Sequence, residues 1–201
     1  MLETIVALLL TVAHGRAQLN TSCVQVVDST ATATSPVPDN QPSLTFMMEG
    51  VTDVRANTVN VVVVVDGSLS IEEDEWILEQ QFAKDTVAAF ARRNIFENGG
   101  TASYVQFSGF AIDEGTFNST ESFNAHVDAV DQFGGGTNIV RGILAGKALL
   151  DSMPSSYGFM VLITDGEHNG AGDVASTAKE ARADNTTTIF AVGVGAAQRT
   201  K

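Results

Sequence analysis

The sequence predicts an α/β domain, a doubly wound and mostly parallel sheet with one short antiparallel edge strand. From residue 60 onward, short segments rich in Val, Ile and Phe alternate with longer segments of helical periodicity, which is typical of a parallel sheet with helices on both faces. Residues 61–65 are five consecutive valines, which indicates a strand buried on both sides. The 201 residues, 44% of them hydrophobic, suffice for one such core and leave little for a second.

The first half of the domain is expected to hold three strands and one crossover helix. The first strand is predicted at 60–66 and the helix at 72–92, where apolar residues recur at near-helical spacing and acidic residues gather in the first turns, as the helix dipole favours. The second strand is predicted at 102–108. The segment 110–117 follows it too closely for a crossover, so it is predicted to turn back as an antiparallel edge strand.

The second half continues the alternation. Helices are predicted at 122–130, 138–150 and 173–183, and strands at 159–164 and 188–194. The acidic run 72–75 is interpreted as a solvated first helical turn. No later stretch is long enough to anchor the chain in a bilayer, so no transmembrane span is expected.

Residues 1–17 are predicted to be a signal peptide. The apolar run 5–13 is too short to span a bilayer, and small residues surround Arg16 at the positions that a signal peptidase would read, with cleavage after Ala17. Glu3 departs from the expected basic start, so a buried N-terminal helix remains the alternative. The prediction implies a secreted, extracellular protein.

Residues 18–58 are predicted to form a Ser/Thr/Pro-rich N-terminal extension. Three of the four prolines fall in 28–43, which has no apolar periodicity and is typical of a flexible spacer. Cys23 is the only cysteine, which argues against a disulfide framework and a thiolate metal cluster. An intermolecular bridge and a spare thiol both remain open, and with them the oligomeric state.

The net charge excludes some classes of partner, and three sequons offer sites for glycans. Eleven basic and 24 acidic residues give a net charge of −13, which repels nucleic acid and anionic membranes and attracts cations. The sequons at Asn20, Asn118 and Asn185 would accept glycans in the secretory pathway. By connectivity, Asn118 and Asn185 are expected at the end of the sheet opposite Asp66.

Polar oxygen groups gather where predicted strands end. Asp66, Ser68 and Ser70 follow the run of valines. Asp165 comes directly after the strand predicted at 159–164, and Thr137 follows a run of three glycines ahead of a helix. Ligand sites of open α/β sheets lie beyond the carboxyl ends of the strands, so these side chains are expected to converge. Hydroxyls and carboxylates without cysteine or clustered histidine favour Mg²⁺, Mn²⁺ or Ca²⁺ over zinc.

The pattern Asp66-x-Ser68-x-Ser70, followed by Thr137 and Asp165, resembles the metal-ion-dependent adhesion site (MIDAS) of von Willebrand factor type A (vWA) domains. The resemblance covers about residues 60–195, and the segments that carry the rest of it are 105–108, 135–138, 163–166 and 190–195. It implies a Rossmann-like vWA fold for 59–201, apparently truncated because the family's last helix, strand and helix are lacking.

The resemblance also implies roles for the site residues. Ser68 and Ser70 would bind the cation directly, Thr137 directly or through water, and Asp66 and Asp165 would hold coordinated waters or bind directly. A carboxylate of an extracellular protein or glycoprotein would complete the metal's shell. The implied function is an adhesion module, and the alternative is a structural or assembly module of an extracellular matrix or coat without metal-gated binding.

An enzyme is not expected. Ser68 and Ser70 have no histidine in a recognisable triad, and the Gly-x-Ser-x-Gly and phosphate-loop motifs are absent. An aspartyl phosphotransferase is the serious rival, but it needs a nearby lysine that Lys147 and Lys179 do not obviously supply. His168, three residues after Asp165, is interpreted as a solvent-facing loop residue, with a place beside the ligand surface as the alternative.

Overall fold

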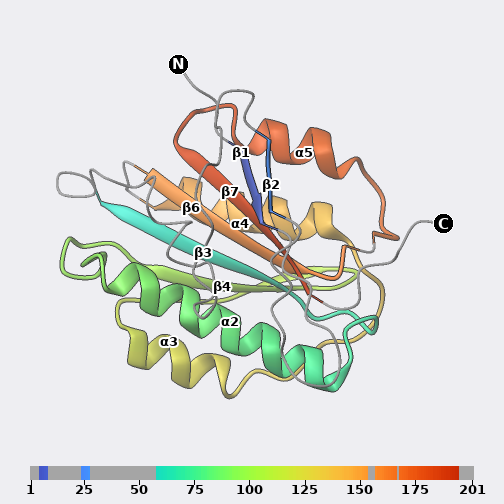
Figure 1. Ribbon diagram of the computed structural model, residues 1–201, viewed down its shortest axis with the longest axis horizontal. Coiled ribbons are helices and arrows are strands. Elements are labelled where there is room, and N and C mark those ends of the chain that lie inside the picture. The colour runs from blue at the N-terminus through green and yellow to red at the C-terminus, as the bar shows by residue number, and fades with distance from the viewer. Residues whose placement is uncertain (1–4, 9–23, 28–57, 154–156, 167, 195–201) are drawn as a thin grey trace.

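The computed structural model describes residues 5–8, 24–27, 58–153, 157–166 and 168–194. Its strands form one sheet in the order β2-β1-β7-β6-β3-β4-β5 (Figure 1). The strands are β1 (Ile5–Leu8), β2 (Val24–Val27), β3 (Val59–Asp66), β4 (Ala102–Phe107), β5 (Ala111–Phe117), β6 (Tyr157–Thr164) and β7 (Thr187–Gly193). The helices are α2 (Glu73–Ala91), α3 (Thr120–Val127), α4 (Ile139–Ser152) and α5 (Val174–Ala181).

The predicted doubly wound sheet is confirmed. β3 lies inside the sheet, parallel to its neighbours β4 and β6, and β7 continues the parallel set beside β6. β5 pairs antiparallel with β4, as the short connection required. Helices α2 and α3 cover one face and α4 and α5 the other (Figure 1). None of the helices in these described ranges is long and apolar enough to cross a membrane.

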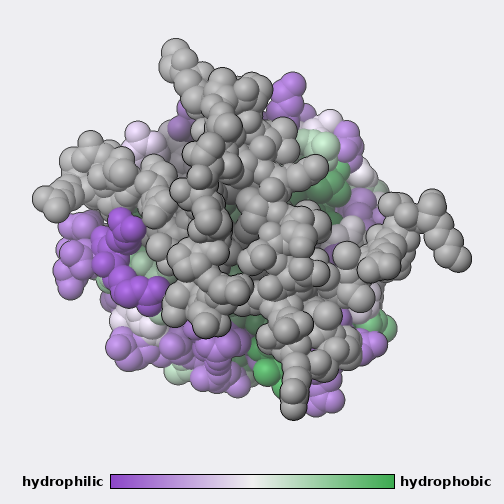
Figure 2. Space-filling view, in the orientation of Figure 1, coloured by the Kyte–Doolittle hydropathy of each residue, from purple (hydrophilic) through white to green (hydrophobic). Residues whose placement is uncertain are grey.

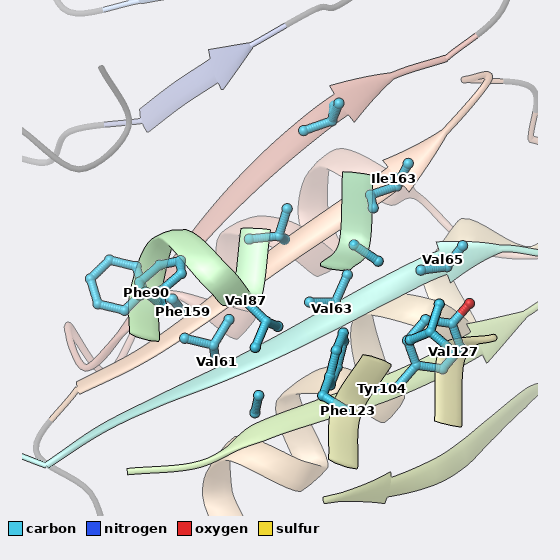
Figure 3. Packing of buried hydrophobic residues seen from close by; sticks show 14 of the residues in the cluster. Val61, Val63, Val65, Val87, Phe90, Tyr104, Phe123, Val127, Phe159 and Ile163 are labelled. Carbon is cyan, nitrogen blue, oxygen red and sulfur yellow. The ribbon is translucent and has the colours of Figure 1, made fainter. Parts of the chain in front are cut away.

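The valine run of β3 supplies both halves of the core, because successive side chains of a strand point to opposite faces. Val61, Val63 and Val65 pack in the cluster under α2 and α3, together with Tyr104 and Phe123 (Figure 3). Val62 and Val64 pack in the second cluster, under α4 and α5. Every residue of β3 is buried, so the strand carries Asp66 to its end inside the protein.

The described residues at the rim of the face shown in Figure 2 are mostly polar, with smaller hydrophobic areas between them. This agrees with the net charge of −13.

The edge of the sheet beyond β7 is built from the N-terminal segment. β1 pairs parallel with β7, and β2 pairs antiparallel with β1. Residues 5–8 are thus a strand and not the helix that was the alternative to a leader. Removal of residues 1–17 would take β1 away and leave β7 without this neighbour. Cleavage stays a prediction, and Cys23, Asn20 and nearly all of the extension 18–58 lie outside the described residues.

Close packing of α4 against the sheet requires glycine at two positions. A Cβ on Gly142 would lie 2.8 Å from Phe107 Cδ1, and one on Gly146 would lie 2.9 Å from Val64 Cγ2. We expect Gly142→Val to lower the free energy of unfolding by about 1–3 kcal/mol through overpacking, measured by urea denaturation. Gly109→Val is the control, because no heavy atom lies within 4 Å of its added Cβ. Equal effects of the two substitutions would contradict this account.

Candidate functional site

The five predicted site residues all lie at the carboxyl end of the parallel strands. Asp66 is the last residue of β3, and Asp165 follows the last residue of the neighbouring strand β6. Ser68 and Ser70 lie in the loop after β3, and Thr137 lies two residues before α4 begins. Because the strands are parallel and adjacent, these loops meet at one end of the sheet, beyond the carboxyl ends of the strands, as expected.

Three hydroxyl groups form a short row. Ser68 Oγ lies 2.9 Å from Ser70 Oγ, and Ser70 Oγ lies 3.5 Å from Thr137 Oγ1. Ser68 and Thr137 are buried, whereas Ser70 is exposed. The row therefore joins segments 67 residues apart in sequence and opens to solvent at one end.

Asp66 is buried behind this row, and its two oxygens accept hydrogen bonds. Oδ1 accepts from the Ser68 backbone amide at 3.0 Å, and Oδ2 accepts from Thr164 Oγ1 at 2.7 Å. The pKa of Asp66 is nevertheless raised to about 6, chiefly by burial and to a smaller extent by the charge of the half-exposed Asp165. The hydrogen bonds from Ser68 and Thr164 lower this pKa, and none of the groups that shift it is a cation.

Gln132 holds the loop after β3, and Gln106 in turn holds the segment that carries Gln132. Gln132 Nε2 donates to the carbonyls of Ser68 and Ile71, at 2.7 and 2.9 Å. Gln106, buried on β4, accepts from the Phe133 amide at 2.8 Å through Oε1. A Cβ on Gly67 would lie 2.1 Å from that same oxygen, which explains why glycine follows Asp66.

The loop that carries Thr137 is held from the other side by Asn169. The Thr137 amide donates to Asn169 Oδ1 at 2.9 Å, and the Asn169 amide donates to the Thr137 carbonyl at 3.0 Å. Gly134 and Gly135 have φ of 69° and 88°, in the left-handed region that favours glycine. His168 is half-buried, and its Nδ1 accepts from the Ile139 amide at the start of α4.

The sequence did not identify the four residues that support this site: Gln106, Gln132, Thr164 and Asn169. Thr164 could have been identified from the sequence, because it directly precedes Asp165. The glutamines had no such signal, since their hydrogen-bond partners lie 25 to 64 residues away.

Two of the predicted glycan acceptors lie far from the site. Asn118 follows β5, whose last residue pairs with the first residue of β4, and Asn185 precedes β7. Both side chains are exposed at the end of the sheet opposite Asp66, as the connectivity predicted. Their glycosylation itself stays a prediction.

The donor atoms suit a hard divalent cation. The site offers three hydroxyls and two carboxylates, without sulfur or imidazole, and oxygen ligands are those that Mg²⁺, Mn²⁺ and Ca²⁺ prefer. Within the described part of the chain, no three His, Cys, Asp or Glu side chains gather as a metal cluster. Such a cation would also offset the charges of Asp66 and Asp165.

Comparison with known proteins extends these observations. Residues 60–201 match the family model of the von Willebrand factor type A domain. Over 143 residues the chain is 27% identical to the human collagen alpha-1(XXI) chain, covering 70% of this chain and 15% of the collagen.

Solved structures share the fold. Proximal thread matrix protein 1 from the mussel byssus, in a structure with a zinc-occupied MIDAS motif, superposes with a TM-score of 0.61 at 22% identity. The match covers 69% of this chain and 38% of the mussel protein. The pilus adhesin SpaC from Lactobacillus rhamnosus GG has a TM-score of 0.56 at 18% identity, over 69% of this chain and 24% of the adhesin. The chain thus spans well under half of each relative.

Proposed function

The chain belongs to the von Willebrand factor type A domain family, and we propose that it is an extracellular, non-enzymatic adhesion module that holds a partner's carboxylate through a divalent cation. vWA domains are generally adhesion or protein-interaction modules. The relatives by name include a collagen and a byssus matrix protein, which supports an extracellular setting.

One observation carries the proposal: Ser68, Ser70 and Thr137 form a contiguous row of hydroxyls in front of the buried Asp66. These residues, with Asp165, would hold Mg²⁺ or Mn²⁺. Ligation mainly by neutral hydroxyls leaves a bound ion electrophilic enough to accept a further carboxylate oxygen. Exposure of Ser70 gives an external carboxylate access to this position.

The cation also explains how an acidic protein can bind an acidic group. With a net charge of −13 the surface repels carboxylates, and the local positive charge has to come from the ion. Binding of the partner should therefore disappear when a chelator removes the metal.

The first test is calorimetric titration of Mg²⁺ and Mn²⁺ into the protein. We expect saturable binding that Asp165→Asn weakens about tenfold to a hundredfold, because this carboxylate would orient or supply a ligand of the ion. Asp85→Asn, which removes an exposed carboxylate from α2, is the control and should bind like the wild type. Folded protein that takes up neither ion would contradict the proposal.

A matrix-assembly role is the second candidate, since the relatives by name include a collagen chain and a thread matrix protein. In that case the fold would serve as a structural unit and partner capture would not depend on metal. Partner binding that persists in EDTA and in Asp165→Asn would favour this alternative.

A further inference from the structure

Three apolar side chains on the loops around the hydroxyl row reach the surface, and we call them the apolar rim: Leu69, Phe110 and the partly buried Phe133. Leu69 is 76% exposed and Phe110 is 47% exposed. Phe110 stacks on Phe133, with ring centroids 5.1 Å apart. Large apolar groups at the surface need an explanation when they gather at one place.

The rim is fixed to the loops that form the site. The Leu69 amide donates to the Gly135 carbonyl at 3.0 Å, and the Gly134 amide donates to the Gly67 carbonyl at 2.7 Å. Leu69 Cδ2 lies 3.2 Å from where a Cβ of Gly134 would be, so the leucine rests on the residue that follows Phe133. Leu69 and the segment that follows Phe133 are therefore joined by hydrogen bonds and contact to the loop that carries Ser68 and Ser70.

The position of Leu69 makes the rim continuous with the proposed metal site, because it lies between Ser68 and Ser70 in the chain. A polypeptide that brings a carboxylate to these hydroxyls must pass over neighbouring surface. Apolar side chains of that polypeptide would remove Leu69 and the Phe110–Phe133 pair from water, which stabilises the complex.

Exposed carboxylates near the site limit the number of acidic groups that the partner can bring to this surface. Glu72 and Glu73, just after Ser70, and Asp131, just before the Gln132–Phe133 segment, are exposed carboxylates. They would repel any acidic group of the partner other than the one bound by the cation. A polyacidic ligand fits this surface poorly.

We propose that the partner segment is a peptide with a single carboxylate and a large apolar side chain within two residues of it. The carboxylate binds at the cation and the apolar side chain packs on the rim. This inference rests on the proposed function and specifies the chemistry of its ligand.

The test uses surface-immobilised pentapeptides with a central Glu in an Ala background, and the same peptides with Phe at each of the other four positions. Binding of the protein is measured in Mg²⁺ and in EDTA. We expect at least one Phe position to bind about tenfold more tightly than the all-Ala background, because burial of an aromatic side chain is worth that factor or more. A peptide of five Glu residues should gain nothing.

Variants of the protein test whether the tighter binding of the Phe peptide comes from the apolar rim. Leu69→Ser and Phe110→Ser should each reduce the advantage of the Phe peptide, while Tyr157→Ser, an exposed aromatic residue at the opposite end of the sheet, should retain it. Calorimetry should give Phe110→Ser and Tyr157→Ser the Mg²⁺ affinity of the wild type, which also shows that both variants are folded.

The outcomes separate the two proposals. Absence of Mg²⁺ uptake would overturn the proposed function together with the rim. Mg²⁺ uptake with EDTA-sensitive binding that is equal for the Phe and Ala peptides would overturn the rim alone. An advantage of Phe that survives both Leu69→Ser and Phe110→Ser would likewise overturn it.

Discussion

Replacement of Glu79 by methionine is expected to raise the free energy of unfolding of the metal-free protein at pH 8 by about 1–4 kcal/mol. Glu79 lies on α2, is fully buried, and neither of its carboxylate oxygens has a hydrogen-bond partner. Burial, with the charges of Asp66 and Asp165, raises its pKa well above 4.5. A buried carboxyl group without a partner destabilises the fold, and methionine fills similar space without that cost.

The raised pKa of Glu79 also determines how the free energy of unfolding changes with pH. Above pH 4.5 the unfolded chain releases the Glu79 proton, whereas the folded protein retains it until the pH reaches the raised value. The folded state then binds more protons, so stability falls as the pH rises, by up to about 1.4 kcal/mol per pH unit. Glu79→Met should remove this contribution and flatten the profile.

Urea denaturation in EDTA at pH 4 to 8 measures both effects. Glu79→Gln should also lose the contribution of Glu79 to the pH dependence but should be less stable than Glu79→Met, because its amide keeps unpaired polar atoms in the core. Glu73→Gln, an exposed residue of the same helix, should match the wild type. If Glu79→Met is less stable than the wild type at pH 8, Glu79 has a favourable role that this account lacks.

Asp66→Asn is expected to stabilise the metal-free protein and abolish its response to Mg²⁺. The pKa of Asp66 is raised from 3.8 to about 6, chiefly by burial, so ionisation costs about 3 kcal/mol of stability above pH 6 and nothing below pH 4. Asparagine removes the charge. Its oxygen can still accept from the Ser68 amide, and its amide can donate to the Thr164 hydroxyl.

Thermal melts at pH 8 and pH 4 test this expectation. In EDTA the variant should melt about 6–12 °C above the wild type at pH 8 and close to it at pH 4, given 2–4 °C per kcal/mol for a chain of this size. Added Mg²⁺ should raise the melting temperature of the wild type at pH 8 and leave Asp66→Asn unchanged. A variant that is less stable than the wild type at pH 8 in EDTA would mean that hydrogen bonding outweighs burial at this carboxylate.

The two variants also separate fold from function. Both remove an unfavourable buried carboxyl group, but only Asp66 lies among the proposed metal ligands. Glu79→Met should therefore still respond to Mg²⁺. A destabilising residue retained at the proposed ligand position is expected where function and stability compete.

Several expectations from sequence were confirmed because they depend on local pattern. The antiparallel course of 111–117 followed from the short connection after β4. The acidic run 72–75 was predicted to be solvated, which is correct for its first three residues. Glu75 is buried, and its Oε2 accepts from the Glu72 amide, which caps the helix.

Periodicity and connectivity were sufficient to predict the α/β class, the alternation of strands and helices from residue 60 onward, and the convergence of five oxygen-bearing residues at one end of the sheet. Strands β1 and β2 were not predicted. Three other features became visible only in the tertiary structure: Gln106, Gln132 and Asn169 hold the loops, Glu79 is buried without a hydrogen-bond partner, and Leu69 rests on Gly134, next in the chain to the Phe133 that stacks on Phe110. Each of these depends on contacts between segments far apart in the chain, and residue types along the sequence do not encode such distances.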